Sequence, residues 1–405
     1  MRKIFSNKLS LILLFTLVTT SLIGQHSVKV KKAEDRVLAS LDAEFNESFA
    51  WWAQVYDSES GGCFYSLSAK KAAPTDTCFA PDIESTSKLV AILQQADLLE
   101  ATTPDFKANV IGFLQGRQDS ESGLFRDPQH RDQYTHLTLS RVTSMALSTI
   151  SDLGGELLYP PPMDNMKHNE EAAQAFAHLE SPEALNAWMR ALPWGDNTWE
   201  VGARLRHQWP FFRELPAERR KVLSKTVEQL VSEMQQPDGF FGYEGKENWG
   251  YRLSGTLKVF SFLHLAGIKL PQAEKVKETT LRILFNEDYD NSIIVYNTAN
   301  LLNIIHQHGE EFDDELRLRI VERCTALLHE MRAPDGAFFT HTYRPTPVEM
   351  GKRLGQDVVE SNSNATGLAH MTRNILIEFL TGESPPFPHP AGSALVKDLD
   401  MASRP

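Results

Sequence analysis

The sequence predicts an all-α protein in which about six helical hairpins close into a ring. Three observations support this fold class. A turn phrase recurs along the chain, an amphipathic helical pattern precedes copies of it, and a second helical segment with a polar start follows. No convincing series of alternating apolar and polar residues, which is typical of strands, accompanies them. Such hairpins cannot bury both faces alone, so neighbouring repeats must complete the core.

The turn phrase consists of a polar residue, an acidic turn, glycine and then aromatic residues. Its four copies occupy residues 56–65, 118–125, 236–241 and 333–339. Pro and Asp initiate a turn, Gly adopts a positive φ, and the aromatic side chains return to the core. Each copy therefore indicates a corner between two helices.

The first helix of a hairpin is clearest in two segments before the last two copies. Their apolar residues recur at i, i+4, i+7, i+8 and i+11, the period of an amphipathic helix. These residues are Leu223, Val227, Leu230, Val231 and Met234 in one segment, and Ile320, Cys324, Leu327, Leu328 and Met331 in the other.

The second helices are distinguished by polar and aromatic residues crowded at their starts. Successive starts lie 46 to 64 residues apart, which suits one hairpin with its loops; the reference positions are Glu84, His136, Trp199, Tyr251, Asn297 and Ser361. Small residues on these segments allow tight packing around a central axis; they are Ser85, Ser254, Gly255, Ala299, Ala365 and Gly367. We expect the polar starts to converge at one mouth of the ring. An open solenoid of the same hairpins is the alternative.

Composition and charge limit the class of protein. The 405 residues are 41% hydrophobic and 23% charged, which is typical of a globular chain. There are 53 acidic against 41 basic residues, and the net charge of −12 disfavours a nucleic-acid partner. One domain is expected over residues 25–383, followed by a flexible Pro/Ser-rich tail over residues 384–405.

The N-terminus has the pattern of a secretory signal peptide. Arg2, Lys3 and Lys8 precede an apolar stretch at residues 9–24, and cleavage is expected near Gly24. Its removal takes the net charge to −15. An uncleaved anchor is the alternative, although 16 residues are short for a span. No later segment is apolar enough for stable membrane insertion, so we expect a periplasmic or secreted protein.

The three cysteines do not indicate a metal site. No CxxC or Cys/His array indicates structural zinc, and we expect neither a metal nor another cofactor. In an oxidising compartment Cys63 and Cys78 are candidates for a disulfide, whereas Cys324 lies in an amphipathic helix and is expected to be a core thiol.

The recurrent Gln…Asp-Gly-Phe phrase resembles the repeats of the α/α-toroid superfamily. That superfamily includes terpenoid cyclases, prenyltransferase β subunits, and several polysaccharide lyases and glycoside hydrolases. The chain lacks the Asp-x-Asp-Asp motif of triterpene cyclases, and Cys324 with Asp313 and Asp314 does not match the prenyltransferase zinc set. With an exported chain, the resemblance implies a toroidal polysaccharide lyase; a terpenoid-cyclase-like enzyme is a minor alternative.

Cleavage of a uronate-containing glycan by β-elimination needs a carboxylate-binding group, a base and an acid. In residues 247–252, Tyr251 is a candidate acid or base, Arg252 a candidate for the substrate carboxylate, and Trp249 a stacking surface for a sugar ring. The structural alternative is that the two aromatic residues pack in the ring and Arg252 pairs with Glu247.

A second cluster supplies further candidates. Tyr134 or His136 is a candidate base, and Arg131 or Arg141 would bind an anionic polysaccharide. Asn297 would polarise the carboxylate or simply bridge helices.

Trp199 and Asn197 would contact carbohydrate, with loop anchoring as the alternative. Because the chain is acidic, such a mouth must be locally basic; the candidate arginines are Arg131, Arg141, Arg204, Arg252 and Arg353.

Two other functions remain open. Glu84 facing Glu360 or Asp357 would make the acid/base pair of a glycoside hydrolase of the (α/α)6 type. A non-catalytic glycan-binding toroid would use the tryptophans alone. The expected function is an exported polysaccharide lyase.

Overall fold

A computed structural model describes residues 30–130, 134–346, 348–349, 352–353 and 355–403. The predicted signal peptide and Arg131 lie outside these residues, as does the side chain of His136. The described chain is mostly helical, with only short strands, so the all-α prediction is confirmed. None of its helices is long and apolar enough to cross a bilayer.

The six predicted second segments are all helices. They are α4 (Ile83–Gln95), α6 (His136–Asp152), α10 (Thr198–Arg206), α13 (Trp249–Leu265), α15 (Ser292–Gln307) and α17 (Ser363–Thr381). Each begins after a polar N-cap whose side chain accepts a hydrogen bond from a first-turn N–H; the caps are Asp82, Thr135, Asn197, Asn248, Asn291 and Asn362. The polar starts are therefore largely a capping pattern.

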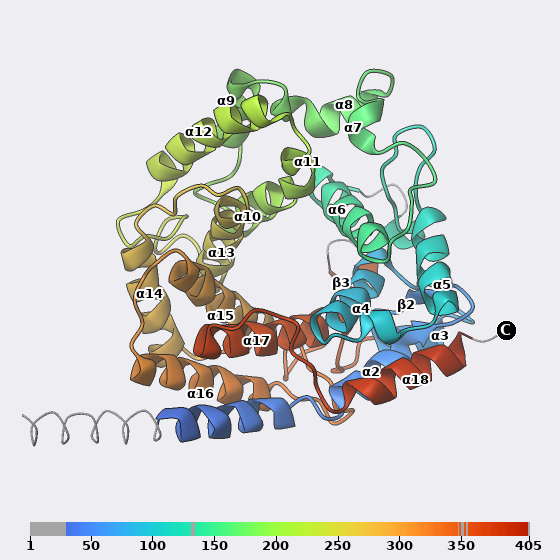
Figure 1. Ribbon diagram of the computed structural model, residues 1–405. Coiled ribbons are helices and arrows are strands. Elements are labelled where there is room, and N and C mark those ends of the chain that lie inside the picture. The colour runs from blue at the N-terminus through green and yellow to red at the C-terminus, as the bar shows by residue number, and fades with distance from the viewer. Residues whose placement is uncertain (1–29, 131–133, 347, 350–351, 354, 404–405) are drawn as a thin grey trace, which may run out of the picture.

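These six helices contact one another in sequence. α4 packs on α6, α6 on α10, α10 on α13, α13 on α15 and α15 on α17, and α17 packs back on α4. Figure 1 shows them on the inside of the molecule, with other helices outside: α5 (Pro104–Gln115), α9 (Pro182–Arg190), α12 (Ala217–Met234), α14 (Ala273–Asn286) and α16 (Asp314–Glu330). α12 and α16 are the two amphipathic helices that the apolar spacing predicted.

Shorter elements complete the fold. They are a helix over residues 30–43, α2 (Ser48–Val55), β1 (Tyr56–Asp57), β2 (Gly62–Cys63), α3 (Leu67–Ala72), η1 (Leu99–Ala101), η2 (Pro128–His130), α7 (Pro162–Asn165), α8 (Glu170–Phe176), η3 (Ala177–Leu179), α11 (Trp209–Arg213), β3 (Val348–Glu349), β4 (Lys352–Arg353) and α18 (Gly392–Ala402). β1 pairs with β2 and β3 with β4, both antiparallel.

Each copy of the turn phrase is fastened to its inner helix in the same way. A threonine hydroxyl accepts a hydrogen bond from the backbone N–H of the returning residue, at 2.9 to 3.3 Å; the pairs are Thr86 with Cys63, Thr143 with Phe125, Thr256 with Phe241, and Thr366 with Phe338. The turn glycines have positive φ, as predicted: Gly61, Gly123, Gly239 and Gly336.

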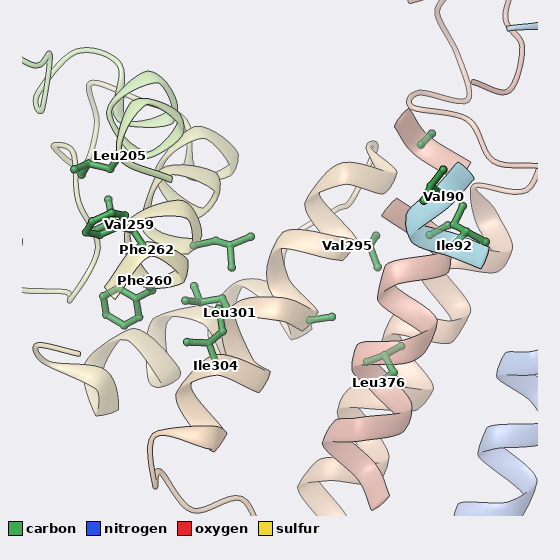
Figure 2. Close-up of a cluster of buried hydrophobic side chains, with 14 of the residues drawn as sticks. Val90, Ile92, Leu205, Val259, Phe260, Phe262, Val295, Leu301, Ile304 and Leu376 are labelled. Carbon is green, nitrogen blue, oxygen red and sulfur yellow. The ribbon is translucent and has the colours of Figure 1, made fainter. Parts of the chain in front are cut away.

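The core lies between the inner and outer helices. Figure 2 shows buried side chains from neighbouring inner helices, including Val90 and Ile92 of α4, Phe260 of α13, Leu301 of α15 and Leu376 of α17.

The prediction of a flexible tail over residues 384–405 is wrong, because the structure has a packed helix there, α18. α18 packs on α2 and α5, and Leu395 and Leu399 are fully buried. Arg373 of α17 donates a hydrogen bond of 2.9 Å to the carbonyl oxygen of Phe387, which fastens the connecting segment. Although the segment is rich in Pro and Ser, its apolar residues have helical spacing. These residues pack against helices that are distant in sequence.

All three cysteines are free thiols, so Cys63 and Cys78 do not form the candidate disulfide. Cys324 is fully buried in α16, as expected for a core thiol.

Candidate functional site

A cavity of about 550 Å³ lies among the six inner helices and α11. This volume is in the range of ligand-binding sites. Its polar and aromatic lining comes from elements far apart in sequence: Lys88, Arg141, Asp152, Trp199, Arg206, His207, Trp209, Arg213, Lys258, Tyr296, Asn297 and Asn364.

The cavity is basic although the whole chain is acidic. Five lining side chains are cationic and one is a carboxylate, Asp152. Because a concave, low-dielectric wall focuses the field of its charges, an anion is attracted into the cavity despite the net charge of −12.

Arg206 is the final residue of α10, and no carboxylate among the described residues pairs with it. Its guanidinium makes no hydrogen bond or ion pair with another residue in the described part of the chain, and burial lowers its pKa. Arginine remains charged in proteins and presents a planar fork that matches a carboxylate. An anionic ligand would complete this site.

His207 follows Arg206 and provides a neutral imidazole. Burial holds its pKa well below the usual value near 6.5, and the charges of Arg141, Arg206 and Lys258 act in the same direction. Glu84 opposes the shift. A neutral histidine beside three cations is equipped to accept a proton.

Tyr296 of α15 has the opposite capability. Asn300 Nδ2 donates a hydrogen bond of 3.0 Å to its hydroxyl oxygen, so the phenolic proton is left to donate elsewhere. Burial raises the pKa of Tyr296, while Arg206 opposes this shift. The phenol is therefore protonated at neutral pH and can serve as a proton donor.

Glu84 and Arg141 form a largely buried ion pair between α4 and α6. Arg141 Nε donates to Glu84 Oε2 at 3.2 Å, and a second guanidinium nitrogen donates to Oε1. Two parallel contacts fix the guanidinium plane. Glu84 thus orients Arg141 in the cavity wall.

Three of the predicted site residues line this cavity: Arg141, Trp199 and Asn297. Lys258 Nζ lies 4.9 Å from the centre of the Trp199 ring. Asn297 Nδ2 donates a hydrogen bond of 2.6 Å to Ser254 Oγ, which bridges α15 and α13.

The residues at the start of α13 are placed differently from the prediction. Tyr251 is 52% exposed, and Trp249 packs on Tyr289 with ring centres 5.3 Å apart. Arg252 is buried and pairs with Asp238 at 2.9 Å, rather than with Glu247. Arg252 also donates to the carbonyl oxygens of Phe241 and Gly242, so it holds the turn phrase in place.

Other predicted residues serve corners and caps outside the cavity. Tyr134 donates a hydrogen bond of 3.2 Å to the carbonyl oxygen of Asp127. Asn197 caps α10, and Glu360 accepts a hydrogen bond of 3.0 Å from the backbone N–H of Ser68. Arg204 pairs with Glu200.

Arg353 pairs with Asp76, and Asp357 is an exposed residue. The helix starts are thus largely occupied by structural contacts.

Arg206, His207 and Tyr296 are not among the residues that the sequence predicted for the site. The sequence predicted chemistry at helix starts, whereas Arg206 and His207 lie at the end of α10. The Arg204–His207 run was the available signal.

No family model and no curated protein matches the chain. In the part of the chain that the structure describes, no group of three or more His, Cys, Asp or Glu side chains is placed to hold a metal ion.

Proposed function

We propose that the protein is an α/α toroid that acts as an exported polysaccharide lyase on a uronic-acid-containing glycan. The observation that supports this function is that His207, Tyr296 and Arg206 line one cationic cavity, where desolvation lowers the pKa of His207 and raises that of Tyr296, and where no described residue pairs with Arg206. The order of helix contacts, from α4 through α17 and back to α4, supports the fold class. The predicted signal peptide supports export.

Binding of the substrate carboxylate is the first step. Arg206 would hold the C5 carboxylate bidentately, and Lys258 and Arg141 would add positive charge around it. These cations stabilise the negative charge that develops when the C5 proton leaves, so they act on the transition state as well as on binding.

The elimination then needs one proton acceptor and one donor. His207 takes the C5 proton, the electrons of the C5–H bond form the C4=C5 double bond, and the C4–O bond breaks. Tyr296 gives its proton to the leaving oxygen. Proton return from His207 to Tyr296 through solvent restores the site.

The hydrolase alternative has less support. It requires two carboxyl groups facing a glycosidic bond, one of them protonated. Both carboxylate oxygens of Glu84 instead accept hydrogen bonds from Arg141, and Glu360 accepts hydrogen bonds from Ser68. Neither Glu84 nor Glu360 lines the cavity.

Incubation with a panel of polyuronates tests the proposal. The mature chain should release reducing ends together with an equal amount of unsaturated, ultraviolet-absorbing ends. Reducing ends without absorbance would establish hydrolysis and reject the lyase. Binding without cleavage across the panel would establish a glycan-binding protein.

Site variants locate the activity. His207→Ala and Tyr296→Phe should each lower kcat by about 10²- to 10⁴-fold, the usual contribution of a general base or acid. Arg206→Gln should raise KM as well. His168→Ala, which removes an exposed histidine outside the cavity, should match the wild type. Full activity of His207→Ala would reject the assignment of the base.

A further inference from the structure

Two histidines outside the central cavity face each other at the C-terminal ends of α13 and α15. His264 lies in the last turn of α13, and His308 is the residue after α15. Their nitrogens, Nδ1 of His264 and Nε2 of His308, are 3.0 Å apart, and their rings are inclined at 64°. Neither residue belongs to the site described above.

The spacing of the two nitrogens fits a chelated metal ion. Imidazole nitrogens bind first-row transition metals at about 2.1 Å, so two nitrogens 3.0 Å apart subtend about 90° at a shared ion. A tetrahedral site would need nitrogens about 3.4 Å apart at that bond length. Right-angled ligand pairs belong to square-planar and octahedral coordination, which suits Cu²⁺ and Ni²⁺.

We propose that His264 and His308 form a two-histidine site for Ni²⁺ or Cu²⁺ that links the ends of α13 and α15. In the metal-free protein the same pair makes an N–H···N hydrogen bond. Metal binding breaks that bond, the bridging proton moves to the other nitrogen of its ring, and both rings turn so that their lone pairs converge on one ion.

The surroundings support a cation at this position. Helix C-termini carry partial negative charge, which favours a bound cation. His264 is partly accessible to solvent, and His308 is exposed. With no third side chain of a metal-binding group in the described residues, water completes the coordination.

Calorimetric titration of NiCl₂ into the mature chain, previously freed of metal with EDTA, tests the site. The wild type should bind one Ni²⁺ at pH 7.5, with a rise in Tm that EDTA reverses. Because the second ligand binds intramolecularly, His264→Ala and His308→Ala should each weaken binding by about 100-fold. His329→Ala, which removes a histidine that contacts Glu44 and has a side chain 71% exposed, is the matched control and should bind as the wild type does.

Any one of three results would overturn the proposal. The first is that the wild type binds no Ni²⁺, and the second is that either single variant keeps wild-type affinity. The third is that the affinity losses of the two variants are small and additive, as expected for separate monodentate histidines. Variant Tm values in EDTA report folding independently of the metal. The outcome does not depend on glycan cleavage, so this site and the lyase proposal fail separately.

Discussion

The role of His207 follows from its neighbours more than from its own chemistry. An exposed histidine is half protonated near pH 6.5. His207 lies beside Arg141, Arg206 and Lys258, and its desolvation and these three charges all lower its pKa and favour the neutral ring. The same cations that would bind the proposed acidic glycan therefore keep His207 unprotonated in the free protein. A bound carboxylate would reduce that repulsion, so the proposed substrate would itself strengthen the base.

The pH dependence of kcat/KM should report this arrangement. That ratio follows the free protein, in which the pKa of His207 is depressed, so the acid limb should lie well below pH 6.5. Removing one cation in Arg206→Gln raises the pKa of His207 and should shift the limb to higher pH. Rate profiles at constant ionic strength measure it. A limb that stays in place in the variant would show that Arg206 does not act on the base.

At the scale of elements, the close packing of inner helices depends on residues without side chains. A Cβ on Gly255 of α13 would lie 2.3 Å from the carbonyl oxygen of Thr198, and one on Gly202 of α10 would lie 2.5 Å from the carbonyl oxygen of Gly255. Because these are backbone atoms and not the ends of flexible side chains, they cannot shift at a low cost in free energy. The two glycines therefore set the distance between α10 and α13, which carry Trp199, Arg206 and Lys258 into the cavity.

Gly255→Ala should consequently destabilise the protein by about 1–3 kcal/mol through overpacking. The matched control is Gly112→Ala in the middle of α5, where an added Cβ meets nothing within 4 Å. That substitution should be neutral or stabilise by up to about 1 kcal/mol, since alanine is the better helix former. Urea unfolding of both variants provides the free energies. Equal effects would argue against a steric role for Gly255.

At the scale of the whole molecule, the C-terminal segment shows how distant packing decides order. α18 covers α2 and α5, so the last helix of the chain packs against some of the earliest ones. The apolar residues of α18 are too few to predict a helix from composition. Their role in packing is evident only from the surface of α2 and α5 that they contact.

Leu395→Ala tests whether α18 belongs to the folded core. Because Leu395 is fully buried, the substitution should cost about 2–5 kcal/mol and lower Tm. Lys397→Ala, on the exposed face of the same helix, should stay within about 0.5 kcal/mol of the wild type. A negligible effect of Leu395→Ala in thermal or urea unfolding would favour the flexible tail that composition predicted.

The sequence by itself determined the helical class, the corners with their positive-φ glycines, and the six second helices, because turn chemistry and the 3.6-residue period are local properties. It also identified Arg141, Trp199 and Asn297 among residues that line the cavity. The tertiary structure alone decided that Arg252 and Tyr134 hold corners, that Glu84 pairs with Arg141, and that His207 and Tyr296 share one cationic cavity. Helix spacing fixes which residues share a face, but the neighbour opposite that face, and hence the charge and burial of a site, comes from packing between distant segments.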